Sequence, residues 1–419
     1  MLEAASYSPR RSPHIVLNRV LLHQNMSHEG DCFLVPGPVR MSRACLDAMA
    51  TPTITARGGE FRDIMARLNR GLRYAFNLTL SSDLKKNESW TGKDGYKVLV
   101  ASGSGTAAME MVMANRFRAN DRVLIPSNGK FGERVAEMAS RFCIVKHLKY
   151  EWGRSFDLGE IEAQLARGNW EAMAICHNET SSGITQDAEE IAEMCERNGI
   201  ALIIDGITSV GGLPVYPEKW KAEAVVVAAQ KCTAGPSGIS ALAVSEHFIE
   251  RCKAIRLQGD SNPTYYLDII AALKKGVDDQ TPWTPAINAA MGWAVALENL
   301  KEEGLENRWN RCAFMANAVR RLFTELGFEL LADEYARSST VTAIMYPDGI
   351  DDSWRIRLRE KYNTQITGAQ DHLKSKMFRI GSMGETPIEE MVEGCKRMLN
   401  CFRDCGLELP EIDVESYFQ

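Results

Sequence analysis

From about residue 95 onward, short apolar runs alternate with turn residues and amphipathic stretches. The apolar runs predict strands at residues 97–101, 122–125, 143–148, 172–177, 201–205, 224–228 and 240–244. The amphipathic stretches between them predict helices at residues 106–116, 132–141, 158–166, 188–198 and 247–255. Alternation of this kind is typical of an α/β fold, here a mainly parallel seven-stranded sheet flanked by helices on both faces.

Polar side chains collect immediately after five of the predicted strands. These polar segments are residues 102–106, 128–131, 177–182, 205–209 and 230–231. Because ligands of open parallel sheets bind beyond the carboxyl ends of the strands, the five segments predict a single crevice.

A second, smaller domain is expected after the Thr-Pro-Trp-Thr-Pro turn at residues 281–285. A long helical stretch at about 286–303 would lead into it, followed by strands near 339–345 and 377–380 and a closing helix at 388–405. We therefore predict an N-terminal arm at 1–34, a large domain at 35–300 and a smaller α+β domain at 301–419.

The composition is that of a soluble globular protein, with 45% hydrophobic and 25% charged residues among 419. A net charge of −6 gives no electrostatic basis for binding nucleic acid. No apolar run approaches the length of about 20 residues needed to span a bilayer.

Eleven cysteines occur without a Cys-x-x-Cys pair. This usage predicts reduced, mostly buried thiols in a cytoplasmic protein, with neither a disulfide framework nor a metal site. The first 30 residues lack the apolar core of a secretory signal. An organellar presequence stays open, but an arm that packs on the body or on a partner is favoured.

Lys231 is the first candidate for chemistry. It ends the apolar run that begins at Val225, and a small, glycine-rich turn follows it. Burial disfavours the ammonium form, so a lysine here can become an amine nucleophile that forms a Schiff base. The alternative is a lysine that simply ends a strand.

Asp205 ends the strand Ala-Leu-Ile-Ile-Asp and is therefore deep in the fold. A carboxylate at that depth needs a partner, and a protonated pyridine nitrogen, an arginine or a set of backbone N–H groups would each serve.

The turn Ser-Gly-Ser-Gly-Thr at residues 102–106 joins a strand to a helix, so its N–H groups could bind a phosphate. It also matches the glycine pattern of dinucleotide sites. That interpretation requires an acidic residue at the end of the next strand, whereas Asp121 precedes that strand and Ser127 ends it.

Three further segments supply candidates. Phe131 could stack on a flat cofactor ring, and Thr180 or Ser181 could bind a ring hydroxyl or a phosphate. His177 is either a structural or an acid–base residue. Arg379, in the middle of an apolar strand, needs either an internal carboxylate or the carboxylate of a substrate.

These motifs together resemble the class V aminotransferases. The segments that carry the resemblance are Ala-Ala-Gln-Lys-Cys-Thr-Ala-Gly-Pro-Ser-Gly around Lys231, Ile-Ile-Asp-Gly-Ile-Thr-Ser around Asp205, Ser-Gly-Ser-Gly-Thr at 102–106 and Phe-Arg-Ile-Gly around Arg379. The resemblance runs from Val35-Pro-Gly-Pro38 to the last helix. It implies a fold-type I enzyme similar to the alanine–glyoxylate and serine–pyruvate aminotransferases.

The resemblance implies that Lys231 holds pyridoxal 5′-phosphate as a Schiff base and then shuttles the proton between substrate Cα and cofactor C4′. It implies that Asp205 keeps the pyridine nitrogen protonated, so that the ring acts as an electron sink. The remaining roles that it implies are phosphate binding by Ser104, Gly105, Thr106 and Gln230, ring contacts by Phe131, Thr180 and Ile207, and substrate binding by Gly37, Arg57 and Arg379.

The resemblance also implies a homodimer in which Thr284 reaches the phosphate of the neighbouring subunit. The expected substrates are a small amino acid, such as alanine or serine, and a 2-oxo acid, such as glyoxylate or pyruvate. Two departures bear on the substrate: Ala56 stands where the family often has histidine before Arg57, and the N-terminal extension is longer than usual.

Other functions remain as alternatives. A lyase, a desulfurase or an aminophosphonate transaminase would use the same cofactor, although Cys232 should point away from Lys231 on an extended backbone. A nicotinamide-dependent oxidoreductase or a non-catalytic binding protein would belong to other classes.

Overall fold

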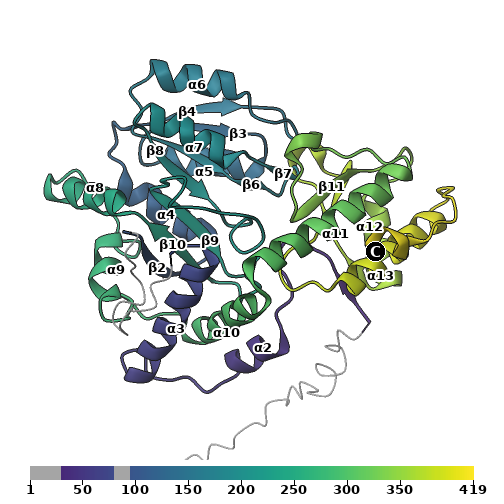
Figure 1. The fold of residues 1–419 in the computed structure, drawn as a ribbon, viewed down its shortest axis with the longest axis horizontal. Coiled ribbons are helices and arrows are strands. Elements are labelled where there is room, and N and C mark those ends of the chain that lie inside the picture. The colour runs from purple at the N-terminus through teal and green to yellow at the C-terminus, as the bar shows by residue number, and fades with distance from the viewer. Residues whose placement is uncertain (1–29, 80–94) are drawn as a thin grey trace, which may run out of the picture. The chain divides into compact units, whose positions relative to one another are not determined.

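The structure is a computed structural model and describes residues 30–79 and 95–419. The body of the chain has two parts, here called the larger and the smaller layer, and a seven-stranded sheet forms the centre of the larger one (Figure 1). Its strands run in the order β2-β10-β9-β8-β5-β3-β4. Strand β10 is antiparallel to both of its neighbours, and the other pairings are parallel. The bounds are β2 (Lys97–Ser102), β3 (Arg122–Ser127), β4 (Ile144–Lys149), β5 (Ala172–Cys176), β8 (Ala201–Asp205), β9 (Ala224–Ala228) and β10 (Ile239–Val244).

Helices cover both faces of this sheet, and the strand side chains alternate between two cores. Ile204 and Val225 pack into one core and Ile203 and Val226 into the other. The strands are buried on both faces, which explains their continuous apolar sequences. The helices on the face of Ile204 are α3 (Gly59–Ala75), α6 (Leu158–Arg167), α7 (Ala188–Arg197) and α10 (Ile287–Glu303). The helices on the face of Ile203 are α4 (Gly105–Arg116), α5 (Lys130–Ala139), α8 (Glu246–Leu257) and α9 (Ile269–Gly276).

The predicted sheet and its helices are confirmed, with differences at some boundaries. Strand β4 begins at Ile144 because Cys143 still bonds to Ala139, the last residue of α5. Strand β5 ends at Cys176 rather than His177. Helix α5 begins at Lys130, two residues before the predicted start, so Phe131 belongs to its first turn.

The C-terminal part forms a smaller layer with its own apolar core. An antiparallel sheet of order β11-β14-β13 packs with three helices. Strand β1 (Cys32–Phe33) pairs in parallel with β12 (Thr364–Gln365), so the segment that precedes the large sheet joins this core. The other bounds are β11 (Val341–Met345), β13 (Thr367–Gly368), β14 (Met377–Gly381), α11 (Leu305–Glu325), α12 (Asp352–Tyr362) and α13 (Ile388–Asp404).

Residues 32–419 form one compact unit. The predicted arm at 1–34 lies mostly outside the described residues. The predicted division of the body at residue 300 remains a prediction.

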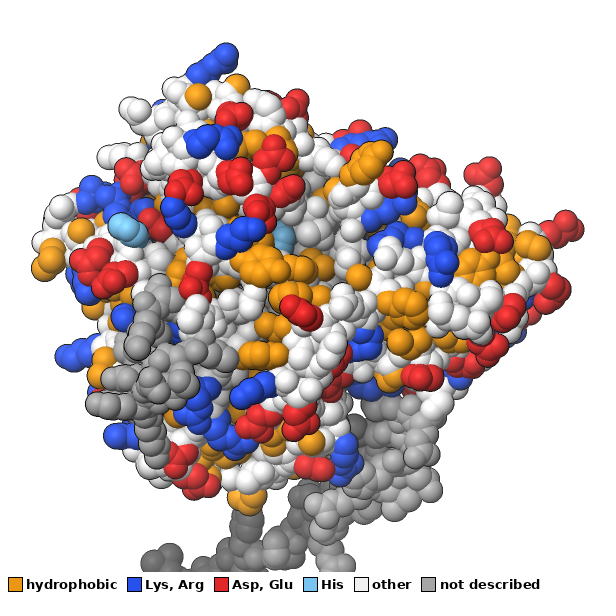
Figure 2. Space-filling model, viewed as in Figure 1, with side chains coloured by type: hydrophobic (Ala, Val, Ile, Leu, Met, Phe, Trp, Pro, Cys, Tyr) orange, Lys and Arg blue, Asp and Glu red, His pale blue; other side chains and the backbone are white. Residues whose placement is uncertain are grey.

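The described surface mixes both signs of charge, and Figure 2 shows acidic and basic side chains interspersed over one face. Within residues 30–79 and 95–419, no helix has the length and apolar character needed to cross a bilayer. The same residues contain no group of three or more His, Cys, Asp or Glu side chains placed to hold a metal ion.

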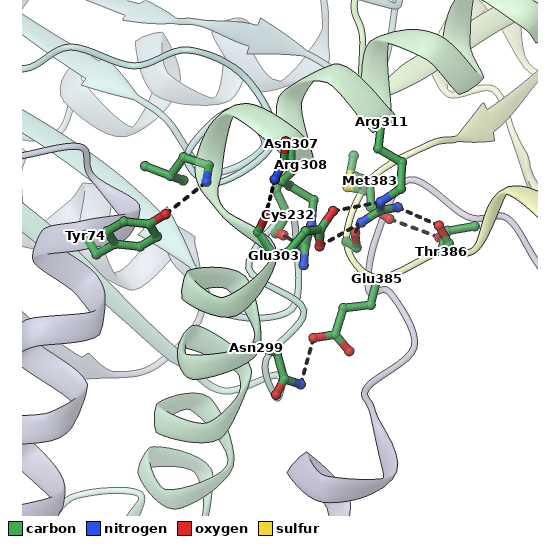
Figure 3. Close-up of polar contacts among 12 residues, drawn as sticks. Tyr74, Cys232, Asn299, Glu303, Asn307, Arg308, Arg311, Met383, Glu385 and Thr386 are labelled. Carbon is green, nitrogen blue, oxygen red and sulfur yellow. Dashed lines mark hydrogen bonds and ion pairs between the residues drawn. The ribbon is translucent and has the colours of Figure 1, made fainter.

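A partly buried ionic cluster joins the two layers where α10 turns into α11 (Figure 3). Glu303 lies between Arg308 and Arg311, with contacts of 2.6 Å and 2.8 Å. Arg308 also donates to the carbonyl of Cys232, next to Lys231, at 3.0 Å. Arg311 donates to the carbonyls of Gly384 and Thr386 in the loop that follows β14. The cluster therefore ties the lysine turn to the smaller layer.

Replacing Glu303 with alanine should lower the free energy of unfolding by about 2–3 kcal/mol, because it leaves the buried Arg308 cation without a carboxylate. The expected loss is smaller than the full cost of breaking a buried pair because the Glu303 side chain is 26% exposed. Denaturant unfolding of both proteins measures the difference. Glu298→Ala is the matched control: its pair with Arg67 is exposed, so its loss should cost less than about 1 kcal/mol. Equal losses in the two variants would contradict the role of the cluster.

Candidate active site

A cavity of about 300 Å³ lies at the carboxyl edge of the large sheet. All five polar segments predicted at the strand ends contribute to it, which confirms the predicted crevice. The predicted site residues that line it are Ser104, Gly105, Thr106, Phe131, Thr180, Asp205, Ile207, Gln230 and Lys231.

Lys231 follows β9 and points into this cavity. Its ammonium donates to the carbonyl of Pro36 at 3.0 Å. Gly37 lies against it so closely that a Cβ at residue 37 would come within 2.5 Å of Lys231 Nζ. Burial lowers the pKa of Lys231 from 10.5 to about 8, and the charge of Arg379 acts in the same direction while Asp205 opposes it. Lys231 is therefore a half-buried amine that loses its proton at about pH 8.

Asp205 is the last residue of β8 and is 7% exposed. Its Oδ1 accepts from the N–H of Ile207 at 3.0 Å, while Oδ2 has no hydrogen-bond partner among the described residues. Burial raises the pKa of Asp205 to about 6, against the lowering effects of that N–H, Arg134 and Lys231. The second oxygen is free to accept from a protonated group in the cavity.

The first turn of α4 forms another wall. Ser104 is the N-cap, and its hydroxyl makes no capping bond. A Cβ at Gly105 would lie 2.5 Å from Ile207 Cδ1 and 3.0 Å from Ala228 Cβ, so a larger residue here would require these neighbours to move. A helix N-terminus with a free hydroxyl is suited to a phosphate.

Arg379, in β14, is 3% exposed and is held by backbone carbonyls instead of an acidic side chain. It donates to the carbonyl of Thr180 at 2.9 Å and, through two nitrogens, to that of Gly368. Burial lowers the pKa of Arg379 to about 10, and the charge of Glu179 acts in the opposite direction. No carboxylate bonds to this guanidinium within the described parts of the chain, so the alternative of an internal acid partner is not found.

Four predicted site residues are not among those that line the cavity: Gly37, Arg57, Thr284 and Arg379. Gly37 and Arg379 contact the lining residues Lys231 and Thr180, whereas Arg57 and Thr284 lie elsewhere. Exposed Arg57 donates to the carbonyl of Thr281 at 2.6 Å and to Gln280. Thr284 lines a separate small hollow together with Ser102. These two residues thus share one region outside the cavity.

His177 and Asp121 have structural surroundings. The ring of His177 packs edge-on against Trp220, with 5.3 Å between the ring centroids, and burial lowers its pKa to about 4. Asp121 accepts from Arg251 and from the N–H of Arg118. His177 therefore fits the structural alternative, and Asp121 is not available to a ribose.

Sequence reasoning missed three residues of this region. Asn178 lines the cavity and donates to Thr208 and Thr340. Arg134 also lines it, with its guanidinium 4.9 Å from the centroid of the Phe131 ring. Glu179 is completely buried behind Phe131. Their positions along the chain were the available signal. Asn178 and Glu179 are the two residues before Thr180, and Arg134 follows Phe131 by about one helical turn.

Fold and cavity together define an enzyme that presents an amine nucleophile, a buried carboxylate and an anion site to one ligand. The family model for aminotransferase class V matches residues 85–363. An uncharacterized aminotransferase of Methanocaldococcus jannaschii is 34% identical, covering 91% of this chain and 95% of its own. The soluble hydrogenase 42 kDa subunit of Anabaena cylindrica is 33% identical, covering 92% and 94%.

Relatives named for their substrates are also similar. The serine–glyoxylate aminotransferase of Hyphomicrobium methylovorum is 30% identical, covering 84% of each chain. The crystal structure of an alanine–glyoxylate aminotransferase from Nostoc superposes with a TM-score of 0.80 at 26% identity, covering 95% of this chain and 98% of that one.

The chain belongs to the class V aminotransferase family. It is a pyridoxal-phosphate-dependent transaminase of fold type I. The cavity fits that cofactor, because Lys231 offers an amine, Asp205 Oδ2 can accept from a ring nitrogen and the start of α4 can receive a phosphate.

Capture of pyridoxal phosphate by the apoenzyme should follow the titration of Lys231. Only the neutral amine attacks a carbonyl, and a pKa lowered to about 8 leaves half of it neutral at that pH. The rate of appearance of the yellow band should therefore rise up to about pH 8 and then level off. A rate that keeps increasing toward the ordinary lysine pKa of 10.5 would contradict the lowered value.

The substitution Asp205→Asn should affect the stability of the apoenzyme and its affinity for the cofactor in different ways. The raised pKa means that the folded apoenzyme holds this proton between about pH 4 and pH 6, so its stability falls as pH rises through that range. Above that range, the ionised carboxylate costs up to about 3 kcal/mol, and the neutral amide of the variant avoids this cost.

The variant apoenzyme should therefore unfold at an equal or higher temperature at pH 8, while its cofactor affinity falls roughly 100-fold. Thermal unfolding and cofactor titration measure the two effects. A less stable variant with normal cofactor affinity would make Asp205 a purely structural residue.

Proposed function

We propose that this transaminase moves the amino group of a small amino acid, of the alanine or serine type, to a small 2-oxo acid such as glyoxylate or pyruvate. The observation that carries the proposal is the size of the cavity: about 300 Å³ has to receive both cofactor and substrate. That volume is at the lower end of the range of about 300–1,000 Å³ for small-molecule sites. The names of the serine–glyoxylate and alanine–glyoxylate relatives agree with the proposal of small substrates.

Lys231 and Arg379 would act directly on the substrate. Arg379 binds the α-carboxylate, since its guanidinium is buried, charged and held only by carbonyls. The neutral amine of Lys231 takes the proton from Cα and later returns one, which its lowered pKa allows at about pH 8. When bound, pyridoxal phosphate supplies the electron sink that stabilises the charge left at Cα.

The other residues bind and orient. Asp205 keeps a ring nitrogen protonated, Phe131 stacks on the ring, and Thr180 and Ile207 contact it. Gly37 leaves room beside the amine of Lys231. The phosphate is bound by Ser104, Gly105, Thr106 and Gln230, whose Oε1 is buried and unpartnered among the described residues.

Arg57 and Thr284 would serve the site of a neighbouring subunit in a homodimer. Their common position outside the cavity of their own chain supports this assignment. We also propose that the enzyme acts in the cytoplasm, as its buried free thiols suggest.

The cysteines near the cavity do not favour the desulfurase alternative. A desulfurase needs a reactive, mobile thiolate. Cys232 is fully buried and donates to the carbonyl of Thr208, and Cys176 donates to that of Asn178. Burial raises the pKa of both thiols. A lyase or an aminophosphonate transaminase is distinguished by its products.

Visible spectroscopy of the purified enzyme tests the proposal. Alanine or serine should bleach the yellow band and release the 2-oxo acid that corresponds to the amino acid added. Glyoxylate or pyruvate should then restore the band. The Lys231→Ala variant should no longer bind the cofactor covalently, and its turnover rate should fall at least about 1,000-fold. If only larger or phosphonate-bearing amines bleach the band, the substrate assignment is wrong while the cofactor assignment stands.

A further inference from the structure

Glu179 is a completely buried carboxylate surrounded by hydrogen-bond donors. Its Oε2 accepts from the backbone N–H groups of Phe131 at 2.9 Å and Gly132 at 2.8 Å. Its Oε1 accepts from the N–H and the hydroxyl of Ser181, at 3.1 Å and 2.6 Å. Four donors around two oxygens match an ionised carboxylate, which can only accept. Burial raises its pKa, and these hydrogen bonds act in the opposite direction.

Through these bonds Glu179 caps helix α5 from a distant part of the sequence. The first turn of a helix has N–H groups without partners inside the helix, and the N-cap of α5, Gly129, has no side chain to receive them. Glu179 and Ser181 receive three of them instead, since Ser181 Oγ also accepts from the N–H of Lys130 at 2.8 Å. A negative charge at this end is further favoured by the helix dipole.

Gly129 makes this approach possible. A Cβ at residue 129 would come within 2.3 Å of Glu179 Cγ and 2.5 Å of Ser181 Oγ. Residue 129 has to be glycine so that the carboxylate can reach the helix end. The position of Phe131 in the cavity wall therefore depends on Glu179.

The same turn also sets the position of Arg379. Thr180, between Glu179 and Ser181, offers its carbonyl to Arg379 Nη1 at 2.9 Å. The two neighbours of Thr180 are bonded to each other through the Glu179 carboxylate, so the carbonyl has little freedom. Glu179 supplies a negative charge close to Arg379 without bonding to it, which leaves the guanidinium free for another carboxylate.

We propose that Glu179 is a positioning residue that holds the ring-stacking Phe131 in the cavity wall and fixes the Thr180 carbonyl on which the carboxylate-binding Arg379 is anchored. The inference rests on the roles proposed above for Phe131 and Arg379. Glu179 itself touches neither substrate nor cofactor; it acts through the α5 N-terminus and the carbonyl of Thr180.

Glu179→Asp tests the proposal, because aspartate keeps the charge near Arg379 but is too short to reach the helix end. The dissociation constant of pyridoxal phosphate from the variant apoenzyme and the dissociation constant of propionate, a non-reactive carboxylate, each measured by calorimetry, should rise about tenfold. Both are binding measurements and do not depend on the identity of the true substrate. Failure of the proposed substrates in the wild-type enzyme would therefore leave this test intact.

Glu133→Asp is the matched control, the same truncation on the same helix. Glu133 accepts from Trp152 and bonds to no residue of the cavity wall, so both constants should stay at the wild-type values. Ser181→Ala, a milder change, should shift them in the same direction as Glu179→Asp, and it replaces that variant if the latter does not fold. Glu179→Asp with a lowered unfolding temperature but unchanged constants for both ligands would overturn the proposal.

Discussion

Burial of charged groups at the carboxyl edge of the large sheet is the constraint on which the rest of the site depends. Lys231, Asp205, Glu179 and Arg379 all lie where hydration is restricted, and a charge there is costly without partners. The structure satisfies them mainly with backbone groups: carbonyls for the two cations and N–H groups for the two carboxylates. Because backbone groups orient these side chains without forming closed side-chain ion pairs, Lys231 and Asp205 keep their charges directed at the cavity, and Arg379 can still receive another carboxylate.

The site is built from both layers, so the contacts that hold the layers together also hold the chemistry. The turn of Lys231 is bonded on one side to the segment after β1, through Gln230 and Val39, and on the other to Arg308 of α11. Arg379 comes from the smaller layer but is anchored on Thr180 of the larger one. A change in the position of one layer would therefore alter the geometry between the amine and the guanidinium.

Much of the fold could be predicted because burial on two faces leaves a clear pattern. Each strand of the large sheet was visible as a short apolar run, and each polar strand end was found at the cavity. The start of α5 was placed two residues late because its cap, Glu179, comes from another strand end. The pairing of β1 with β12 had no local signal either, since a two-residue strand is defined only by its partner.

Local periodicity and turn chemistry encode the α/β class, the order of the strands along the chain and the residue types at each strand end, so the amino-acid pattern is enough to predict them. It also marked Lys231 and Asp205, since a charged residue that ends an apolar run stands out. The folded chain was needed to show which partners those charges have, that carbonyls instead of an acid hold Arg379, and that His177 packs on Trp220. Those outcomes depend on contacts between residues far apart in the chain, and no local pattern records them.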